Sequence, residues 1–262
     1  MTAARLVVAG LACLAVELSA APPRSVIIAA HRGLSEGAPE NTLAAFRQSI
    51  ERGVPVIELD VRDTRDHQLV VIHDETLDRT TDCTGFVNHS ALEWVRSCRV
   101  GNGEGVPTFG EVIALVRGKP VRLLVDVKQG TPIDPVLRNI RRYRAEAKVI
   151  LGLRSTDQVV RARAALPDTT ILAFAPRIGD APAFAAAGVQ IIRLWSDWVE
   201  ADPALVARTR ALGPQVWVLV GRKLPRTRSE WHALHGRMLH LGPDGLITDR
   251  PEWMPTMTEA ER

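Results

Sequence analysis

The chain has 262 residues, of which 46% are hydrophobic and 24% are charged, so it can bury a sizeable core and does not have the composition of a disordered protein. Its net charge is only +3, and its tightest basic group, from Arg138 to Arg144, follows a helical spacing. A nucleic-acid binder would show a basic stripe with stacking aromatic rings, so the sequence argues against that class.

The first residues have the pattern of a secretory signal. Arg5 precedes an apolar run at residues 6–16 that is too short to span a bilayer, and small residues follow at 19–21. We therefore expect residues 1–21 to be a signal peptide and the protein to be exported, to the periplasm or outside the cell. A membrane anchor and a wrongly assigned start are the alternative interpretations. No later segment is long and apolar enough to predict stable membrane insertion.

From residue 25 onward, short β-branched runs alternate with longer amphipathic stretches. The runs predict eight strands, at residues 26–30, 56–61, 121–128, 148–153, 170–175, 189–194, 215–220 and 245–248. The stretches predict helices at residues 42–52, 108–116, 135–145, 157–166, 181–187, 203–212 and 229–239, with Asp202 as the cap before Pro203. This alternation favours parallel strands closed into a TIM (β/α)8 barrel over residues 22–262.

One region interrupts the alternation after the second barrel strand. A short apolar run at residues 69–73 is followed by a polar, Thr- and Gly-rich stretch, so we expect an insertion at about residues 75–106, above the barrel mouth. Cys83 and Cys98 lie inside it. In an exported protein they would form a disulfide that closes a loop of about 15 residues, worth roughly 3 kcal/mol. In a cytosolic protein they would be two unpaired thiols.

Ionisable residues occur where barrel enzymes carry their catalytic groups, at the ends of strands. Glu58 and Asp60 are spaced i, i+2, so both point to one face of a strand, and Asp126 and Lys128 repeat this spacing on the next barrel strand. Carboxylates packed in this way repel one another unless a cation lies between them or one of them takes up a proton. The three carboxylates therefore predict a hard oxygen site for one divalent cation, Mg²⁺ or Ca²⁺.

Two histidines converge on these carboxylates. His31 ends the first predicted strand. A tight turn centred on Asp66 and His67 would pair residues whose numbers sum to about 133 and place His73 opposite Asp60. His31 and His73 are therefore the candidate acid/base pair. We expect surface or loop positions for His67, His89, His232 and His240, and a packing role on a helix for His235.

Several motifs in a fixed order resemble the glycerophosphodiester phosphodiesterase family over about residues 26–252. They are His31-Arg32-Gly33, Pro39-Glu40-Asn41-Thr42, Ala45-Phe46, Glu58-x-Asp60-Val61, His73-Asp74, Leu77-x-Arg79-Thr80-Thr81, Val106-Pro107-Thr108, Trp217 and the run from Asp244 to Pro251.

The resemblance implies a TIM barrel with a small insertion and metal-dependent hydrolysis of glycerophosphodiesters to glycerol 3-phosphate and an alcohol. It implies that His31 and His73 are general acid and base, that Arg32 and Lys128 bind the substrate phosphate, and that Glu58, Asp60 and Asp126 hold the cation. The nucleophile is then either water or a neighbouring glycerol hydroxyl, which would form a cyclic phosphate.

The chain departs from the family at two positions. Asp126 stands where the family usually has Glu, and Val220 stands where it usually has Asn. The shorter Asp126 side chain puts the position of the metal in question, and Val220 does the same for contacts to the substrate alcohol.

Two alternative functions stay open on the same barrel. One is cleavage of the head group of lysophospholipids or sphingomyelin, which needs an apolar rim to which Trp94 and Val95 are candidate contributors. The other is a barrel that binds phosphoesters without turning them over.

Overall fold

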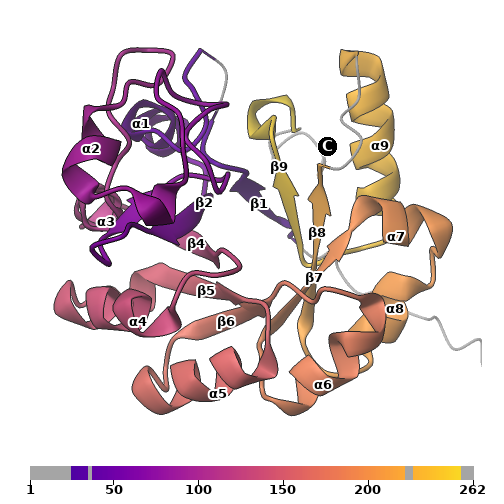
Figure 1. Ribbon diagram of the computed structural model, residues 1–262. Coiled ribbons are helices and arrows are strands. Elements are labelled where there is room, and N and C mark those ends of the chain that lie inside the picture. Colours follow the sequence, from indigo (N-terminus) through magenta and orange to yellow (C-terminus); the bar gives the residue numbers. More distant parts are fainter. Residues whose placement is uncertain (1–24, 35–36, 222–226, 255–262) are drawn as a thin grey trace, which may run out of the picture.

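The computed structural model describes residues 25–34, 37–221 and 227–254, and in these residues nine strands form one sheet. Eight of them are parallel and close into a barrel, because the first strand pairs with both the second and the last (Figure 1). The barrel strands are β1 (Ile27–Ala30), β2 (Val56–Asp63), β4 (Arg122–Val127), β5 (Val149–Leu153), β6 (Thr170–Ala173), β7 (Ile191–Trp195), β8 (Gln215–Val220) and β9 (Gly245–Thr248). The predicted TIM barrel is confirmed, strand by strand.

Helices surround the barrel (Figure 1). Those that match the predicted helices are α1 (Leu43–Glu51), α3 (Phe109–Val116), α4 (Ile133–Arg142), α5 (Thr156–Ala165), α6 (Ala181–Ala186), α8 (Leu205–Arg210) and α9 (Arg228–His240). Two further helices were not predicted, α2 (Leu92–Ser97) and α7 (Ser196–Ala201). Single 3-10 turns are η1 (Val87–His89), η2 (Glu146–Lys148), η3 (Ile178–Asp180) and η4 (Pro251–Trp253).

The predicted helix cap at Asp202 is wrong. Asp202 ends α7, where its backbone N–H bonds to the carbonyl of Trp198, and α8 starts only at Leu205. Pro203 accounts for the break, because it has no N–H to continue α7 and holds the residue before it in an extended conformation.

Two apolar clusters hold the barrel together. The inner one fills the barrel and includes Trp217, Phe174 and Leu124, and the outer one packs the strands against the helices. Trp217 lies directly against Gly245, where a Cβ atom would come within 2.6 Å of the indole ring. Val220 belongs to the outer cluster and is buried, so its side chain packs toward the helices.

The strand β3 (Leu69–Val71) runs antiparallel to β2, but the predicted register of this hairpin is wrong by one residue. Val61 pairs with Val71 and Asp63 with Leu69, so Asp60 lies opposite Ile72 instead of His73. The loop has three residues instead of two, and its third residue, His67, has a φ of 57°. A three-residue loop that ends in a left-handed residue is the next most common hairpin after the two-residue form.

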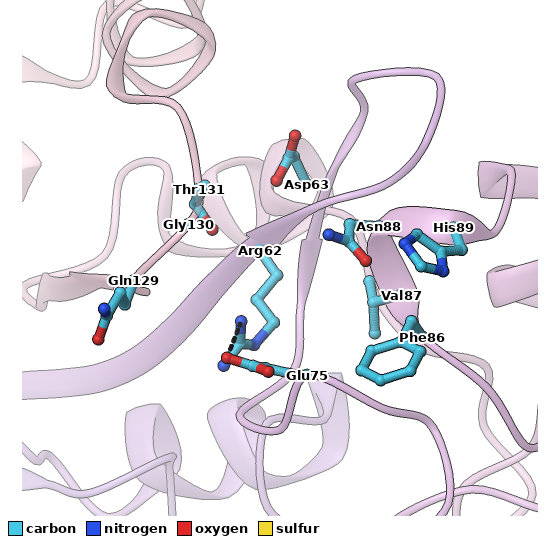
Figure 2. A pocket seen from close by; sticks show the side chains of 10 residues that line it. All are labelled: Arg62, Asp63, Glu75, Phe86, Val87, Asn88, His89, Gln129, Gly130 and Thr131. Atoms are coloured by element: carbon cyan, nitrogen blue, oxygen red, sulfur yellow. Dashed lines mark ion pairs between the residues drawn. The ribbon is translucent and has the colours of Figure 1, made fainter.

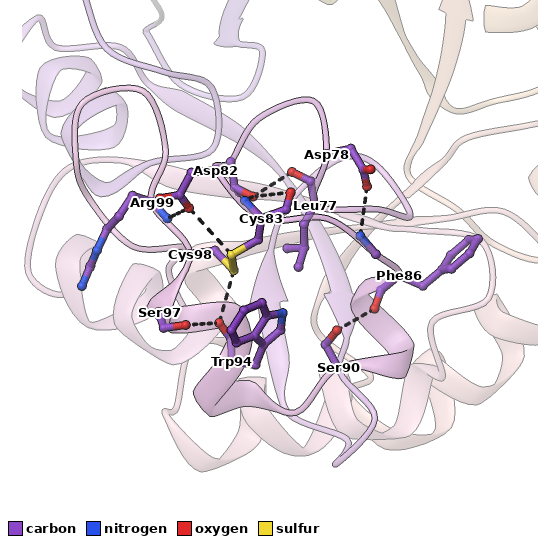
Figure 3. Close-up of a disulfide and its surroundings, with 12 residues drawn as sticks. Leu77, Asp78, Asp82, Cys83, Phe86, Ser90, Trp94, Ser97, Cys98 and Arg99 are labelled. Atoms are coloured by element: carbon purple, nitrogen blue, oxygen red, sulfur yellow. Dashed lines mark hydrogen bonds between the residues drawn. A yellow bond between two sulfur atoms is a disulfide. The ribbon is translucent and has the colours of Figure 1, made fainter.

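The segment predicted as an insertion, residues 75–106, carries α2 and η1 and has a small core of its own. Leu77, Val87 and Val95 are fully buried in that core. Figure 3 shows the disulfide between Cys83 and Cys98, whose Cα atoms lie 5.5 Å apart. Of the two interpretations of these cysteines, the structure therefore has the disulfide.

The predicted signal peptide, residues 1–21, lies outside the described residues. Within the described part of the chain, no helix has the length and apolar character needed to cross a membrane.

Candidate active site

The seven predicted site residues meet at one end of the barrel, where the parallel strands have their carboxyl ends. Glu58 and Asp60 point inward from β2, and Asp60 lies beside Asp126 in the parallel register of β2 and β4. Each of the three offers a carboxylate oxygen within 4.8 Å of the others, and all three side chains are buried. The predicted i, i+2 geometry therefore brings these carboxylates together.

Burial and mutual repulsion act strongly on this acidic cluster. Burial and the charge of Asp60 raise the pKa of Glu58 to about 7. Burial would also raise the pKa of Asp60, but the charges of Lys128 and Arg32 outweigh it and hold that pKa well below its usual range. A cation between the carboxylates would stabilise their ionised forms.

His31 is held between two carboxylates. Its Nδ1 lies 2.7 Å from Asp249 Oδ1, so Nδ1–H donates to Asp249, and its Nε2 lies 4.0 Å from Glu58 Oε2. Burial lowers the pKa of His31, but the charge of Glu58 and the bond to Asp249 outweigh it, so the net pKa is raised. Asp249 thus orients the ring and leaves Nε2 facing the acidic cluster.

His73 is oriented in the same manner by its neighbour in the chain. Its Nδ1 donates to Asp74 Oδ1 over 2.6 Å, which leaves Nε2 available for proton transfer. Burial lowers the pKa of His73, and the charge of Lys128 adds to that effect. The pKa values of the two histidines are therefore shifted in opposite directions.

An ion-pair chain connects His73 with Arg32. Asp74 accepts a bond from Arg79, Arg79 also donates to Glu40, and Glu40 accepts from Arg32 Nη1 over 2.9 Å. Arg32 has a φ of 57°, and its backbone N–H donates to Glu58 Oε2 over 2.8 Å. The chain of charges fixes the guanidinium of Arg32 beside the acidic cluster.

Asn41 and Lys128 hold Asp60 in place. Asn41 Nδ2 donates to Asp60 Oδ2 over 2.7 Å, and Asn41 Oδ1 accepts from the backbone N–H of Asp60. Lys128 Nζ lies 2.6 Å from Asp60 Oδ1 and 2.8 Å from Asp126 Oδ2, so it bridges two of the three carboxylates.

Arg154 contacts Asp126, one of the two residues at which the chain departs from the family pattern. Its Nη2 lies 2.6 Å from both oxygens of Asp126. An arginine therefore occupies space next to the shorter carboxylate. The sequence analysis did not single out Arg154, and it named Asn41, Asp74 and Asp249 only within motifs, without a role in the site. Arg154 and Asp249 each follow a barrel strand by one residue, which is a signal that a search of strand ends can use.

A hollow lies beside the site, between the end of β2, the loop after β4 and the insertion. Figure 2 shows Arg62 next to Glu75, at 4.0 Å, with Phe86 and His89 on the insertion side. Arg62 Nε also donates to the backbone carbonyl of His73 over 2.9 Å. This hollow therefore lies next to His73.

Of the two residues proposed from the sequence for an apolar rim, only Trp94 is exposed. Trp94 is 53% exposed, but Val95 is fully buried in the core of the insertion, so the prediction that Val95 contributes to a rim is wrong. Phe86 is exposed on the same insertion.

The family model described as "Glycerophosphoryl diester phosphodiesterase family" matches residues 31–253. A glycerophosphodiester phosphodiesterase of Caldanaerobacter subterraneus is 32% identical over 239 residues, which cover 86% of this chain and 95% of the relative.

Solved structures of phosphodiesterases superpose on this chain. A glycerophosphodiester phosphodiesterase of Agrobacterium tumefaciens superposes with a TM-score of 0.72 at 26% identity, covering 87% of this chain and 98% of the other. An Oleispira antarctica phosphodiesterase in complex with sn-glycerol-3-phosphate shares the fold, with a TM-score of 0.74 at 22% identity over 87% and 94% of the two chains.

Proposed function

The chain belongs to the glycerophosphoryl diester phosphodiesterase family and is an enzyme of that class, and we propose that it hydrolyses glycerophosphodiesters to glycerol 3-phosphate and an alcohol by a metal-dependent His/His mechanism. The observation that supports this most directly is the convergence of two carboxylate-oriented histidines on one buried acidic cluster. Family membership as an enzyme argues against the alternative of a barrel that only binds phosphoesters.

Glu58, Asp60 and Asp126 would hold one divalent cation, Mg²⁺ or Ca²⁺. Their oxygens are close enough to share an ion, and burial together with the charge of Asp60 raises the pKa of Glu58, which a bound cation would reverse. When bound, such a cation neutralises the charge of the phosphodiester and polarises its P–O bonds.

Arg32 and Lys128 would bind the non-bridging oxygens of the phosphodiester. Both side chains are already held beside the acidic cluster, Arg32 by Glu40 and Lys128 by Asp60. Binding of the substrate would therefore need little further ordering of these side chains. Fixed positive charge at this place stabilises the negative charge that develops on the phosphoryl oxygens in the transition state.

His31 and His73 would exchange the protons. One Nε2 accepts a proton from the attacking hydroxyl, which is that of water or of the substrate glycerol, and the other donates a proton to the leaving alkoxide. Asp249 and Asp74 each bond to Nδ1 of one ring, which would leave Nε2 of both rings for proton transfer.

The test is release of glycerol 3-phosphate from glycerophosphocholine and glycerophosphoethanolamine by purified residues 22–262. We expect release with Mg²⁺ or Ca²⁺ that EDTA abolishes, and loss of release in His31→Ala and in His73→Ala by roughly 10²- to 10⁴-fold. His240→Ala, which changes an exposed histidine on α9, is the matched control and should keep full activity. Full activity in either active-site variant would exclude the acid/base assignment.

The head-group phosphodiesterase of lysophospholipids or sphingomyelin is the second candidate, supported by the exposed rings of Trp94 and Phe86 on the insertion. Turnover of lysophosphatidylcholine at a higher rate than glycerophosphocholine, lost in Trp94→Ala, would favour it.

We also propose that the enzyme acts outside the cytoplasm. The pattern of residues 1–21 supports this, and so does the disulfide between Cys83 and Cys98, since disulfides persist in oxidising compartments. Mass spectrometry of the protein recovered from each cell fraction tests it. An intact N-terminus in the cytoplasmic fraction would contradict export.

A further inference from the structure

A second hollow opens at the barrel mouth, on the side of the acidic cluster away from the insertion. It has a volume of about 500 Å³ and lies over the ends of β5, β6 and β7. Arg154, Phe174, Arg193 and Trp195 line it, and we call it the arginine pocket. Gln129 borders both this pocket and the hollow of Figure 2.

Positive charge is concentrated in the arginine pocket. The guanidinium of Arg154 lies 5.0 Å from the ring centre of Phe174, and that of Arg193 lies 5.1 Å from the same ring and 4.0 Å from the ring of Trp195. None of the lining residues that the structure describes is acidic, but Arg154 pairs with Asp126 beside the pocket, and Arg193 is 2% exposed. The aromatic rings hold the guanidinium groups of Arg154 and Arg193 in place inside the pocket. Guanidinium groups fixed in this way are suited to bind an anion.

Arg154 links the arginine pocket to the proposed phosphodiester site. Arg154 uses its Nη2 for both oxygens of Asp126, and Asp126 belongs to the acidic cluster. A substrate whose phosphodiester lies at that cluster therefore has one of its two alcohol halves next to the pocket. The pocket is large enough for a polar organic group, since ligand sites typically measure a few hundred Å³.

We propose that the arginine pocket binds a second phosphate, carried by the alcohol half of the substrate. Guanidinium groups bind phosphate through paired hydrogen bonds, and two of them in one pocket match a phosphate monoester dianion. The phosphodiester itself is bound by Arg32 and Lys128 and does not need them. This inference rests on the proposed function and adds a substrate class: glycerophosphodiesters of phosphorylated alcohols, preferred over those of the cationic alcohols choline and ethanolamine.

The experiment compares kcat/KM for glycerophosphoinositol 4-phosphate with that for glycerophosphoinositol, two substrates that differ only in the second phosphate. We expect a preference for the phosphorylated substrate of roughly 10- to 100-fold, as a charge-assisted hydrogen-bond pair provides. Arg193→Gln should bring the ratio close to one, whatever its effect on kcat/KM for glycerophosphoinositol itself. Arg193→Lys, which keeps the charge and loses the paired hydrogen bonds, should give an intermediate ratio.

The matched control is Arg177→Gln, which removes an exposed arginine near the rim that pairs with Asp180. It should leave the ratio unchanged. A wild-type ratio near one, or a ratio that Arg193→Gln does not alter, would overturn the inference while the proposed function stands. The wild-type comparison decides this even if Arg193→Gln fails to fold. If none of the glycerophosphodiesters is hydrolysed, the proposed function fails and this inference fails with it.

Discussion

Folding stability should depend on pH through a histidine outside the active site, His235 on α9. Its side chain is stacked on Trp231 at 3.5 Å between ring centres and is 2% exposed. Nδ1 donates to the carbonyl of Trp231 over 2.8 Å, and Nε2 accepts from the hydroxyl of Thr248 over 2.9 Å. This arrangement suits the neutral ring, because a protonated Nε2 could no longer accept the bond from Thr248.

Burial lowers the pKa of His235 to about 4. In the unfolded chain the same group titrates near its ordinary value of about 6.5. Protonation therefore favours the unfolded state: the stability is fully present above about pH 6.5 and is lost as the pH falls toward 4. Between about pH 8 and pH 5 the loss amounts to about 2 kcal/mol, since each pKa unit is worth about 1.4 kcal/mol.

The assay is urea unfolding of the wild type and of His235→Phe at about pH 8 and pH 5. Phe keeps the stacking on Trp231 but does not titrate, and the other histidines contribute equally to both proteins. The wild type should therefore lose about 2 kcal/mol more than His235→Phe over this range. His240→Gln, an exposed position on the same helix, should behave like the wild type. Identical losses in wild type and His235→Phe would refute the reasoning.

Three further predictions follow from particular contacts. Replacing Cys83 and Cys98 together by Ala should lower the free energy of unfolding by about 3 kcal/mol, because the disulfide closes a loop with a sequence separation of 15. Urea unfolding measures this, and an unchanged midpoint would contradict it. Gly152→Ala should lower the free energy of unfolding by about 1–3 kcal/mol in the same assay. The added Cβ would overlap the ring of Phe174 and lie 2.9 Å from the carbonyl oxygen of Val125. Wild-type stability would show that the ring can move aside. Asp249→Asn should reduce kcat by about 10²-fold or more with an unchanged circular dichroism spectrum, because the neutral amide no longer stabilises the His31 cation. A normal kcat would exclude a role for Asp249 in proton transfer.

Much of the barrel could be predicted because its signal is local. Each β-branched run buries both faces of a parallel strand, and this alternation with amphipathic helices repeats along the chain. The register of the β2–β3 hairpin could not be predicted, because it depends on a positive φ at His67, which few non-glycine residues adopt. The start of α8 differs from the prediction because α7, which the sequence pattern does not reveal, ends just before Asp202. Pro203 therefore follows the end of one helix instead of opening the next.

The chemistry of the site was predictable where residue type and strand position coincide. Glu58 and Asp60 share a face by the spacing of the strand alone, and the barrel then places Asp126 beside Asp60. Arg154 was missed because an arginine near a strand end is commonly a surface residue, and only the fold turns its guanidinium toward Asp126. The disulfide lay within the predicted possibilities, but only the fold decides between it and free thiols.

The closure of the barrel has a consequence for how the protein acquires activity. His31 follows β1 and its partner Asp249 follows β9, so the contact joins residues 218 positions apart, and β1 pairs with both β2 and β9. We expect a contact of such sequence separation to form late, because closing the loop between its residues costs the most chain entropy. During refolding the helical signal should therefore return before catalysis does. A nascent chain in which β9 has not yet paired with β1 lacks the contact with Asp249 that orients His31, so we expect turnover to report completion of the barrel.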